Sequence, residues 1–449
     1  MDMQIIILVL FIGGYLAITL EHTFKIDKLI PALGMMALLW AIIALNHMDV
    51  FNVNSVLKQL EPTHLEEILL HHLGKTSEIL IFLIGAMTIV EIIDYFDGFA
   101  TIKRFIRTKS KVRLLWIFSI LAFILSAIID NLTATIVLIT ILQKVVRDKE
   151  TRLWFAGLIV ITANAGGAWS PIGDVTTTML WIANKVTAWQ LVEHTLIPSI
   201  VCMVVPVLIA SKFKVFSGEI DTEFEEEEPP SKFGATMLYL GLGAIIFVPI
   251  FKTVTHLPPY IGMMLSLAFV ATFAEVFSNR LFDLSHVGEE AEASDAAAHH
   301  SPVHKSLGKV EMPSILFFLG ILMAVAALES LGMLFNFAID LDHAIPNRDI
   351  VVGILGVGSA IIDNVPLVAA SIGMFSEPID HPLWHFIAYS AGTGGSILVI
   401  GSAAGVVAMG MEKINFFWYL KKIGFLAFLG FVSGGIAFIL IRDFILNVA

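Results

Sequence analysis

Long apolar runs separated by short polar stretches follow one another along the whole chain. Each run is continuously apolar over about 17 to 22 residues, the length with which an α-helix crosses a hydrocarbon core of roughly 30 Å. Strands of a membrane β-barrel would instead alternate in polarity over about 10 residues. The pattern therefore predicts an all-α polytopic membrane protein. Uninterrupted helices are expected at residues 4–20, 29–45, 78–95, 190–210, 233–250, 259–277, 313–333 and 423–441.

One hexapeptide interrupts this pattern twice with the same two polar residues. SAIIDN occupies residues 126–131 and, letter for letter, residues 359–364. A glycine-rich stretch follows each copy, TANAGGAWSPIGDVTTT at 162–178 and SAGTGGSILVIGSAAGV at 390–406. Alignment of the glycine pairs in these two stretches also aligns a third glycine. We therefore expect two repeats of about 220 residues each.

Basic residues flank the first hexapeptide on both sides. They are Lys103, Arg104, Arg107, Lys109, Lys111 and Arg113 before it, and Lys144, Arg147, Lys149 and Arg152 after it. Because Lys and Arg are enriched in cytoplasmic loops, both ends of residues 114–143 are expected on the cytoplasmic side. A segment of about 30 residues with both ends on one side is too short for two full crossings, which predicts a re-entrant hairpin. Its tip is expected near Asp130 and Asn131.

The second hexapeptide has acidic flanks, which predict the opposite orientation for residues 351–376. The halves would then be inverted repeats with one hairpin entering from each face, an arrangement that secondary transporters use. Glycine and proline interrupt residues 153–184 and 386–411, so these are expected to be discontinuous helices lining a cavity. The predicted fold is an inverted-repeat secondary transporter with two re-entrant hairpins and two discontinuous helices.

The expected domain organisation follows from these two repeats. Residues 1–210 form the first repeat and residues 233–449 the second. An acidic cytoplasmic linker at 211–232 joins them. The second repeat contains a loop at 278–312 whose polar composition is typical of a solvated, mobile segment.

Composition excludes a soluble globular protein. Of the 449 residues 57% are hydrophobic and 15% charged, and the mean hydropathy is +0.86. A soluble domain needs more polar surface to cover its core. Much of the net charge of −12 lies in the acidic linkers, and no nucleic-acid partner is expected. The single cysteine, Cys202, excludes an intrachain disulfide.

Three carboxylates, Asp130, Asp174 and Asp363, lie within the interrupted elements. An ionised aspartate at the centre of a bilayer costs about 2.5 to 3.5 kcal/mol. Neither hairpin and neither glycine-rich stretch contains a Lys or Arg that could neutralise this charge. The counter-charge is therefore expected to be a bound cation or a proton.

Oxygen ligands surround these carboxylates, whereas cysteine and histidine are absent from the motifs, which favours Na⁺ or Li⁺ over a transition metal. We expect Na⁺ to bind through the three carboxylates. The neighbouring polar candidates are Asn131, Thr133, Asn164, Thr176, Thr177, Asn364, Thr393, Ser396 and Ser402. Burial favours the protonated carboxyl and a bound cation favours the ionised one, so proton and cation would compete for one site.

A simpler interpretation of the aspartates stays open beside this one, since Asp before a helical run is a common N-cap. Asp130 and Asp174 can each cap the helix that follows. A second group of residues at or inside helix ends is expected to serve proton access or pH response. These are His71, Glu78, Glu91, Glu311 and Glu329.

With these motifs in view, the chain resembles the NhaD-type sodium/proton antiporters of the ion transporter superfamily, which also contains arsenite pumps and sodium-coupled dicarboxylate carriers. The likeness runs from FLIGAMTIVEIID (82–94) through both SAIIDN motifs to GTGGSILVIGSAAGV (392–406). It implies Na⁺(Li⁺)/H⁺ exchange without a cofactor, a homodimer, and a multi-pass location in the inner membrane of a bacterium. It also implies that Ser359 joins the residues above in handling cations.

Other functions remain as alternatives. A sodium-coupled anion carrier or arsenite efflux permease of the same fold is the nearest one, although carboxylates at both hairpin tips would repel an anion. An intramembrane aspartyl protease would also use two buried aspartates. Its expected motifs are missing, because Asp94–Tyr95 has the wrong order and Asp174 lacks the first glycine of the pattern. Discontinuous helices favour alternating access over an open channel, and no enzymatic activity is expected.

Overall fold

The computed structural model describes residues 3–19, 26–54, 59–103, 108–220, 232–285, 301–361 and 364–446. Helices account for most of this part of the chain, with one two-stranded antiparallel sheet. Seven of the described helices are long and apolar enough to cross a membrane. The prediction of an all-α polytopic membrane protein is therefore confirmed.

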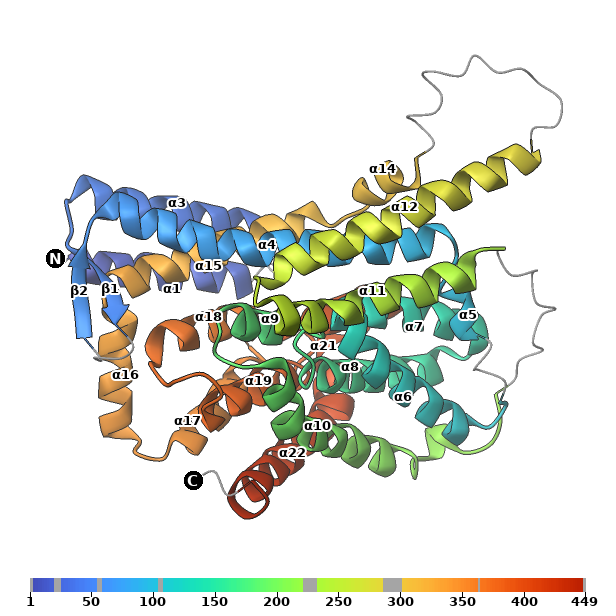
Figure 1. Ribbon diagram of the computed structural model, residues 1–449. Coiled ribbons are helices and arrows are strands. Elements are labelled where there is room, and N and C mark those ends of the chain that lie inside the picture. The colour runs from blue at the N-terminus through green and yellow to red at the C-terminus, as the bar shows by residue number, and fades with distance from the viewer. Residues whose placement is uncertain are drawn as a thin grey trace.

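Helices from both halves of the chain form an outer layer, shown along the upper side of Figure 1. They are α1 (Met3–Thr19), α3 (Leu29–Leu45), α4 (Leu65–Tyr95), α11 (Gly234–Thr255), α12 (Pro259–Ser285) and α15 (Met312–Ser330). α15 packs against both α3 and α4, and α12 packs against α4 and α11. The small sheet, β1 (Val50–Asn54) and β2 (Gln59–Thr63), adjoins α4 and α15.

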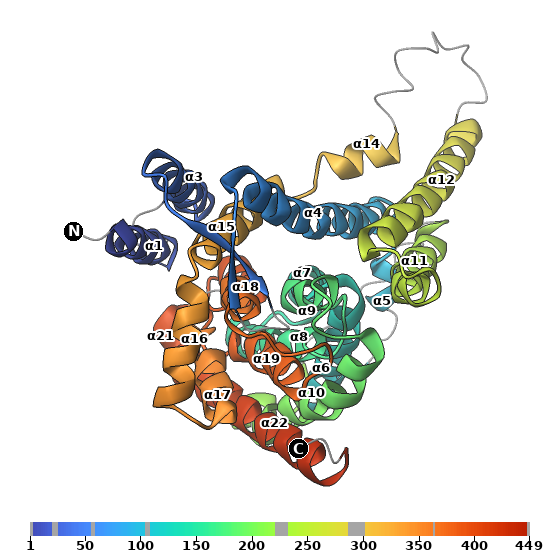
Figure 2. The same ribbon diagram turned by 60° about the vertical axis from the view of Figure 1, so that its left-hand side comes forward.

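A second layer holds both SAIIDN motifs and both glycine-rich stretches (Figures 1 and 2). Its first-half helices are α6 (Lys111–Ile129), α7 (Asn131–Val145), α8 (Lys149–Gly167), α9 (Val175–Ile182) and α10 (Ala188–Ala210). Its second-half helices are α17 (Arg348–Gly358), α18 (Asn364–Met374), α19 (Pro382–Gly394), α20 (Ala403–Glu412) and α22 (Phe425–Phe444). Shorter elements complete the chain: α5 (Ala100–Lys103), η1 (Lys214–Phe216), α14 (Pro302–Leu307), α16 (Met333–Ala344), α21 (Phe416–Tyr419) and η2 (Leu420–Gly424).

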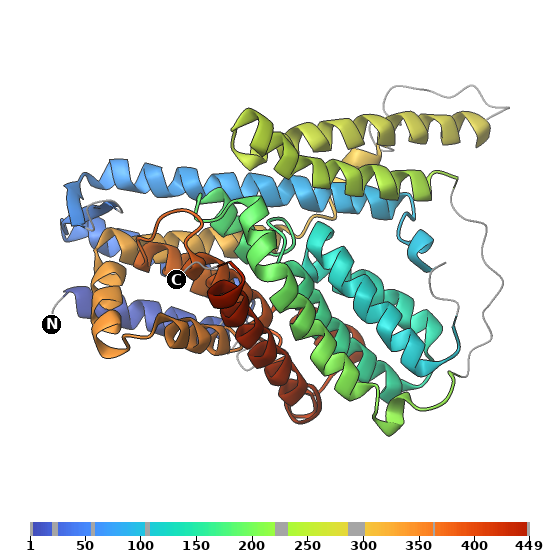
Figure 3. The same cartoon turned by 60° about the horizontal axis from the view of Figure 1, so that its bottom comes forward.

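The two helical pairs that contain the hexapeptides lie at different ends of the molecule. Figures 1 and 3 place α6 and α7 toward the end where α12 finishes, and α17 and α18 toward the end with the small sheet. α10 and α22 pack against each other beneath them (Figure 3). The broken helices pack against these pairs, α8 against α6 and α7, and α19 against α17 and α18. Whether the pairs re-enter a membrane from opposite faces stays a prediction.

Glycines fix the same close contacts in both halves. A Cβ on Gly167 would lie 2.6 Å from the carbonyl oxygen of Gly173, and one on Gly395 would lie 2.6 Å from that of Gly401. Gly166 likewise approaches the backbone of Phe123 in α6, and Gly394 that of Gly356 in α17. The serine of each hexapeptide donates a hydrogen bond to the broken helix beside it. Ser126 Oγ lies 2.6 Å from Ala163 O, and Ser359 Oγ lies 3.2 Å from Ala391 O.

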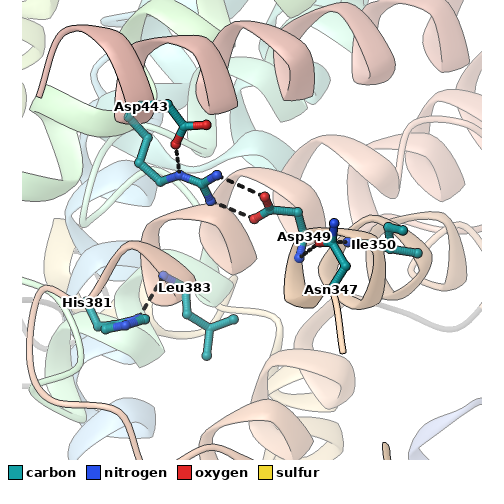
Figure 4. A network of polar contacts seen from close by, with 7 residues as sticks. Asn347, Asp349, Ile350, His381, Leu383 and Asp443 are labelled. Carbon is teal, nitrogen blue, oxygen red and sulfur yellow. Dashed lines mark hydrogen bonds and ion pairs between the residues drawn. The ribbon is translucent and has the colours of Figure 1, made fainter. Parts of the chain in front are cut away.

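A polar network ties the start of α17 to the last helix (Figure 4). Both oxygens of Asp349 accept hydrogen bonds from the guanidinium of Arg442, at 2.6 and 2.9 Å. Asn347 Oδ1 caps α17 by accepting from the backbone N–H of Asp349 and Ile350. The guanidinium therefore anchors the first arm of the second helical pair to α22.

Asp349→Ala is expected to lower the thermal stability of the protein without removing exchange. A bidentate, part-buried pair of this kind stabilises a fold by about 1 to 3 kcal/mol, and removal of Asp349 takes away both hydrogen bonds that its carboxylate accepts from Arg442. Thermal melting of the detergent-solubilised protein measures the change. Asp443→Ala is the matched control, because that exposed carboxylate shares Arg442 through a single 2.7 Å contact. Equal melting temperatures for Asp349→Ala and wild type would contradict this role.

Several expected boundaries need correction. α4 begins at Leu65 rather than at residue 78, because the polar stretch before it is still rich in helix-forming Leu, Glu and Lys. The expected linker 211–232 is partly packed, since Phe216 is buried and Ile220 N donates to Lys109 O at 2.8 Å. The expected mobile loop 278–312 is helical at both described ends, in α12 and α14. Residues 221–231 and 286–300 of these segments lie outside the described residues.

Candidate functional site

Each broken helix restarts at a residue that caps its second half. Asp174 precedes α9 and accepts a hydrogen bond from Thr176 N at 3.0 Å. Ser402 precedes α20 and accepts from Gly405 N at 3.2 Å. The two residues share nearly the same backbone conformation, with φ −148° in both and ψ 149° and 152°. One half of the chain therefore presents a carboxylate where the other presents a hydroxyl.

The carboxylate of Asp174 joins the tips of both helical pairs. Its Oδ2 accepts hydrogen bonds from Asn131 Nδ2 at 2.8 Å and from Asn364 Nδ2 at 3.2 Å. Asn131 starts α7 and Asn364 starts α18, so each tip contributes the asparagine of its SAIIDN motif. Asp174 is 3% exposed, which means that its charge is removed from bulk water. A carboxylate at this depth depends on nearby donors and on bound cations or protons.

The same hydrogen-bonded chain continues into the second half. Asn131 Nδ2 lies 2.9 Å from Asn164 Oδ1, and Asn164 Nδ2 donates to Ser402 Oγ at 2.9 Å. All of these side chains are buried. The chain from Asn364 through Asp174 to Ser402 thus crosses between the two halves of the protein.

Asp130 occupies the turn between α6 and α7 and caps α7. Its Oδ1 accepts from Thr133 N at 2.8 Å and its Oδ2 from Thr133 Oγ1 at 2.9 Å. The expectation that Asp130 and Asp174 act as N-caps is therefore confirmed. With φ 78° and ψ 158°, Asp130 adopts a backbone conformation that is essentially confined to glycine and costs about 1 to 3 kcal/mol. Backbone strain of this size is found at functional sites more often than elsewhere.

A cavity of about 80 Å³ lies against these residues and has room for several water molecules. Its polar end includes Asp130, Asn131, Asp174 and Asn364. Its other walls are mostly apolar and come from the outer layer. They include Phe82 and Met87 of α4, Ile245 of α11, Met263 of α12, and Phe317 and Phe318 of α15. The cavity therefore separates the capped half-helices from the outer helices.

The remaining candidates lie around this centre. Thr176 Oγ1 is buried and has no hydrogen-bond partner among the described residues, so it is a spare ligand close to Asp174. Thr177 donates to Asp174 O at 2.9 Å. In the second half, Thr393 and Ser396 donate to backbone carbonyls, so their lone pairs stay available to accept. Asp363, the third expected carboxylate, lies outside the described residues.

The residues expected to serve proton access do not line the cavity. His71 is exposed near the start of α4, and Glu78 and Glu91 are half-buried farther along it. Glu329 packs against Gly373 of α18. Glu311 lies nearest, because Ser314, which lines the cavity, donates to its Oε2 at 3.1 Å.

Two further lining residues escaped the sequence analysis. Thr178 lies one turn beyond Asp174 and donates to Pro171 O at 3.0 Å. Lys28, at the start of α3, also lines the cavity. The motifs contain no basic residue, and this one comes from a distant segment that no motif marks. A search for cationic residues before each predicted helix could have found it.

Known proteins resemble this chain over most of its length. A family described as "Citrate transporter" matches residues 6–384. Sodium/proton antiporter 2 of Arabidopsis thaliana is 38% identical over 97% of this chain and 99% of its own length. Na⁺/H⁺ antiporter NhaD of Vibrio cholerae is 32% identical over 92% of this chain and 87% of its own.

One further sequence relative and one solved structure also resemble this chain. Sodium/proton antiporter 1 of Arabidopsis thaliana is 43% identical over 83% of this chain, which spans 63% of that relative, less than two thirds of its length. The crystal structure of the YdaH transporter of Alcanivorax borkumensis superposes on this structure with a TM-score of 0.53 at 12% sequence identity. The alignment covers 95% of this chain and 98% of the YdaH chain. This last likeness shows the fold alone.

Proposed function

The chain belongs to the citrate transporter family and, within it, to the sodium/proton antiporters of NhaD type, and we propose on this basis that it exchanges Na⁺ or Li⁺ for H⁺ across a membrane. The observation that carries the proposal is the buried carboxylate of Asp174, held between the asparagines of both hairpin tips. Such a site selects a small cation or a proton as its counter-charge.

The exchange follows from competition at one place. A protonated Asp174 is neutral and can stay buried, and an ionised Asp174 needs a cation beside it. The amide oxygens of Asn131, Asn164 and Asn364, together with Thr176 Oγ1, are the hard ligands that Na⁺ prefers. Asp130 and Asp363 add carboxylates at the two tips. Because either occupant neutralises the site, the protein can reorient in both loaded states and not when empty.

The proposed reorientation is alternating access between the outer layer and the layer of hairpins and broken helices. The apolar walls of the cavity support it, since Phe82, Phe317 and Met263 make no directional bonds with the polar end. We place the protein as a homodimer in the inner membrane of a bacterium. A sodium-coupled carrier of an organic anion is the alternative that the experiment below separates.

Proton movement in everted vesicles from a host without sodium antiporters tests the proposal. After respiration acidifies the interior, addition of NaCl or LiCl is expected to collapse the pH gradient, and KCl or an organic dicarboxylate is not. A response that requires the dicarboxylate would favour the anion carrier. Vesicles that contain the empty vector are the control.

The apparent Na⁺ affinity is expected to increase with pH. If one proton competes with one Na⁺, each unit of acidification raises the half-saturating Na⁺ concentration by up to about tenfold in the range where the site titrates. Initial rates over a matrix of Na⁺ concentrations and pH values measure this dependence. A half-saturating concentration that stays constant across pH would argue against a shared site.

A further inference from the structure

We propose that Tyr419 is a positioning residue for the cation site, because its hydroxyl fixes the break of the second broken helix. The inference rests on the proposed function, since it concerns how tightly the residues assigned above hold Na⁺. It goes further by giving a part in cation binding to the segment that leads into the last helix. None of the predicted site residues lies beyond Ser402.

One hydrogen bond joins Tyr419 to the break between α19 and α20. Its Oη donates to the backbone carbonyl of Ser396 at 2.8 Å, and the two residues are 0% and 1% exposed. Ser396 lies in the non-helical stretch between the two half-helices, where a carbonyl lacks the N–H partner that a continuous helix provides. Among the described residues, no other group donates to this oxygen. The hydroxyl therefore satisfies a buried carbonyl that the break has freed.

A π-helical turn, η2, follows Tyr419 and lies against the same break. Single turns of this kind are frequent at functional sites. A Cβ on Gly424, the last residue of the turn, would lie 2.8 Å from Ile397 O, so backbone meets backbone there. The side chain of Ile423 packs closely on Gly157 of α8, the broken helix of the first half. The turn thus contacts the broken helices of both halves.

The first broken helix has an internal donor in place of this tyrosine. Thr178, in its second half-helix, donates to Pro171 O within the break at 3.0 Å. Alignment of the two glycine-rich stretches places Val406 at the position of Thr178. Because valine has no hydroxyl, the second break takes its side-chain donor from another element, and Tyr419 provides it.

The second break leads to the central carboxylate through Ser402. This residue caps α20 and accepts from Asn164 Nδ2, while Asn164 Oδ1 accepts from Asn131. Asn131 in turn donates to Asp174. Release of the Ser396 carbonyl frees the stretch that ends at Ser402, and a displaced Ser402 no longer holds these amides in place. Loss of the hydroxyl should therefore weaken Na⁺ binding.

The test is Na⁺ binding to purified protein, measured by titration calorimetry at fixed pH with choline keeping the ionic strength constant. Tyr419→Phe removes only the hydroxyl and is expected to weaken Na⁺ binding about 3-fold to 10-fold, the size of one hydrogen bond. Tyr389→Phe is the matched control, because Tyr389 is also 0% exposed and donates to Phe431 O at 2.8 Å. Phe431 lies inside α22, where its carbonyl keeps a helical partner, so this variant should bind Na⁺ like wild type.

Two further variants test the contact and the route. Gly424→Ala keeps the Tyr419 hydroxyl but adds a methyl group against Ile397 O, so it should also weaken Na⁺ binding. It decides the question if Tyr419→Phe yields no folded protein. In a Ser402→Ala background the route to the carboxylate is already interrupted, and Tyr419→Phe should then add less than about 2-fold.

Each outcome decides one of the two proposals. Wild-type Na⁺ affinity in folded Tyr419→Phe, or an equal loss in Tyr389→Phe, would overturn the role of Tyr419. So would an undiminished effect of Tyr419→Phe in the Ser402→Ala background. Exchange is measured separately in proteoliposomes. If Tyr419→Phe binds Na⁺ more weakly than wild type but the wild type moves no protons in response to Na⁺, the function fails and the role of Tyr419 stands.

Discussion

Asp174→Asn is expected to abolish Na⁺/H⁺ exchange while the protein still folds and reaches the membrane. The substitution keeps the volume of the side chain and removes the charge that the proposed mechanism requires. Loss of about 3 kcal/mol of cation stabilisation, close to the cost of one charge in a bilayer, reduces binding on the order of 100-fold. Exchange in proteoliposomes should therefore fall to the level of empty liposomes.

Hydrogen bonding at Asp174 strengthens this expectation. The carboxylate accepts on both oxygens, from Thr176 N on one and from the amides of Asn131 and Asn364 on the other. Asparagine offers one acceptor and one donor in the same places. The new amide N–H groups would then face another donor, either Thr176 N or the amides of Asn131 and Asn364, unless neighbouring amides rotate.

Two variants separate charge from capping. Asp174→Ser places the residue of Ser402 at the equivalent cap, so it should fold well and still not exchange. Asp148→Asn makes the same substitution as Asp174→Asn at the exposed N-cap of α8, where Asp148 Oδ2 accepts from Thr151 N at 2.8 Å, and should exchange normally. Wild-type exchange by Asp174→Asn or Asp174→Ser would remove the central carboxylate from the mechanism.

Gly394→Ala is expected to destabilise the protein strongly. A Cβ at residue 394 would overlap the carbonyl group of Gly356, and backbone in a buried helix cannot move aside as a flexible side chain can. Overpacking costs about 1 to 3 kcal/mol and occasionally more, and contact with buried backbone favours the upper end of that range. We expect little folded protein by size-exclusion chromatography, and no exchange from what remains.

Glycines on neighbouring helices provide the control. A Cβ at Gly353 in α17 or at Gly410 in α20 would meet no atom within 4 Å. Alanine there should preserve or slightly raise stability, because it also favours the helix. If Gly394→Ala and Gly353→Ala yield the same amount of folded, active protein, the close approach of α19 to α17 is not required.

Local patterns in the sequence were sufficient for much of this fold. The apolar run at 29–45 became α3 with the same bounds, because nothing in it competes with helix formation. Asp130 and Asp174 were identified both as possible caps and as possible ligands, and their capping is confirmed. The small sheet at 50–63 was missed, since each of its strands is only five residues long.

Contacts across long sequence separations could not be obtained in this way. The amide of Asn364 reaches Asp174 over 190 residues, and Asn164 reaches Ser402 over 238. Hydrophobic periodicity gives the start of a helix but not its partner in another repeat. The same limit explains why Lys28 was not identified from the sequence, because its position in the cavity lining depends on how α3 packs against α15.

The turn at Asp130 carries a consequence for how this sequence is selected. Glycine would relieve the positive φ at that position, so a chain chosen only for a stable fold would favour glycine there. Stabilising substitutions at strained positions commonly reduce activity. Heat resistance gained at this turn would therefore be expected to cost activity, whereas substitutions far from it are free of that conflict.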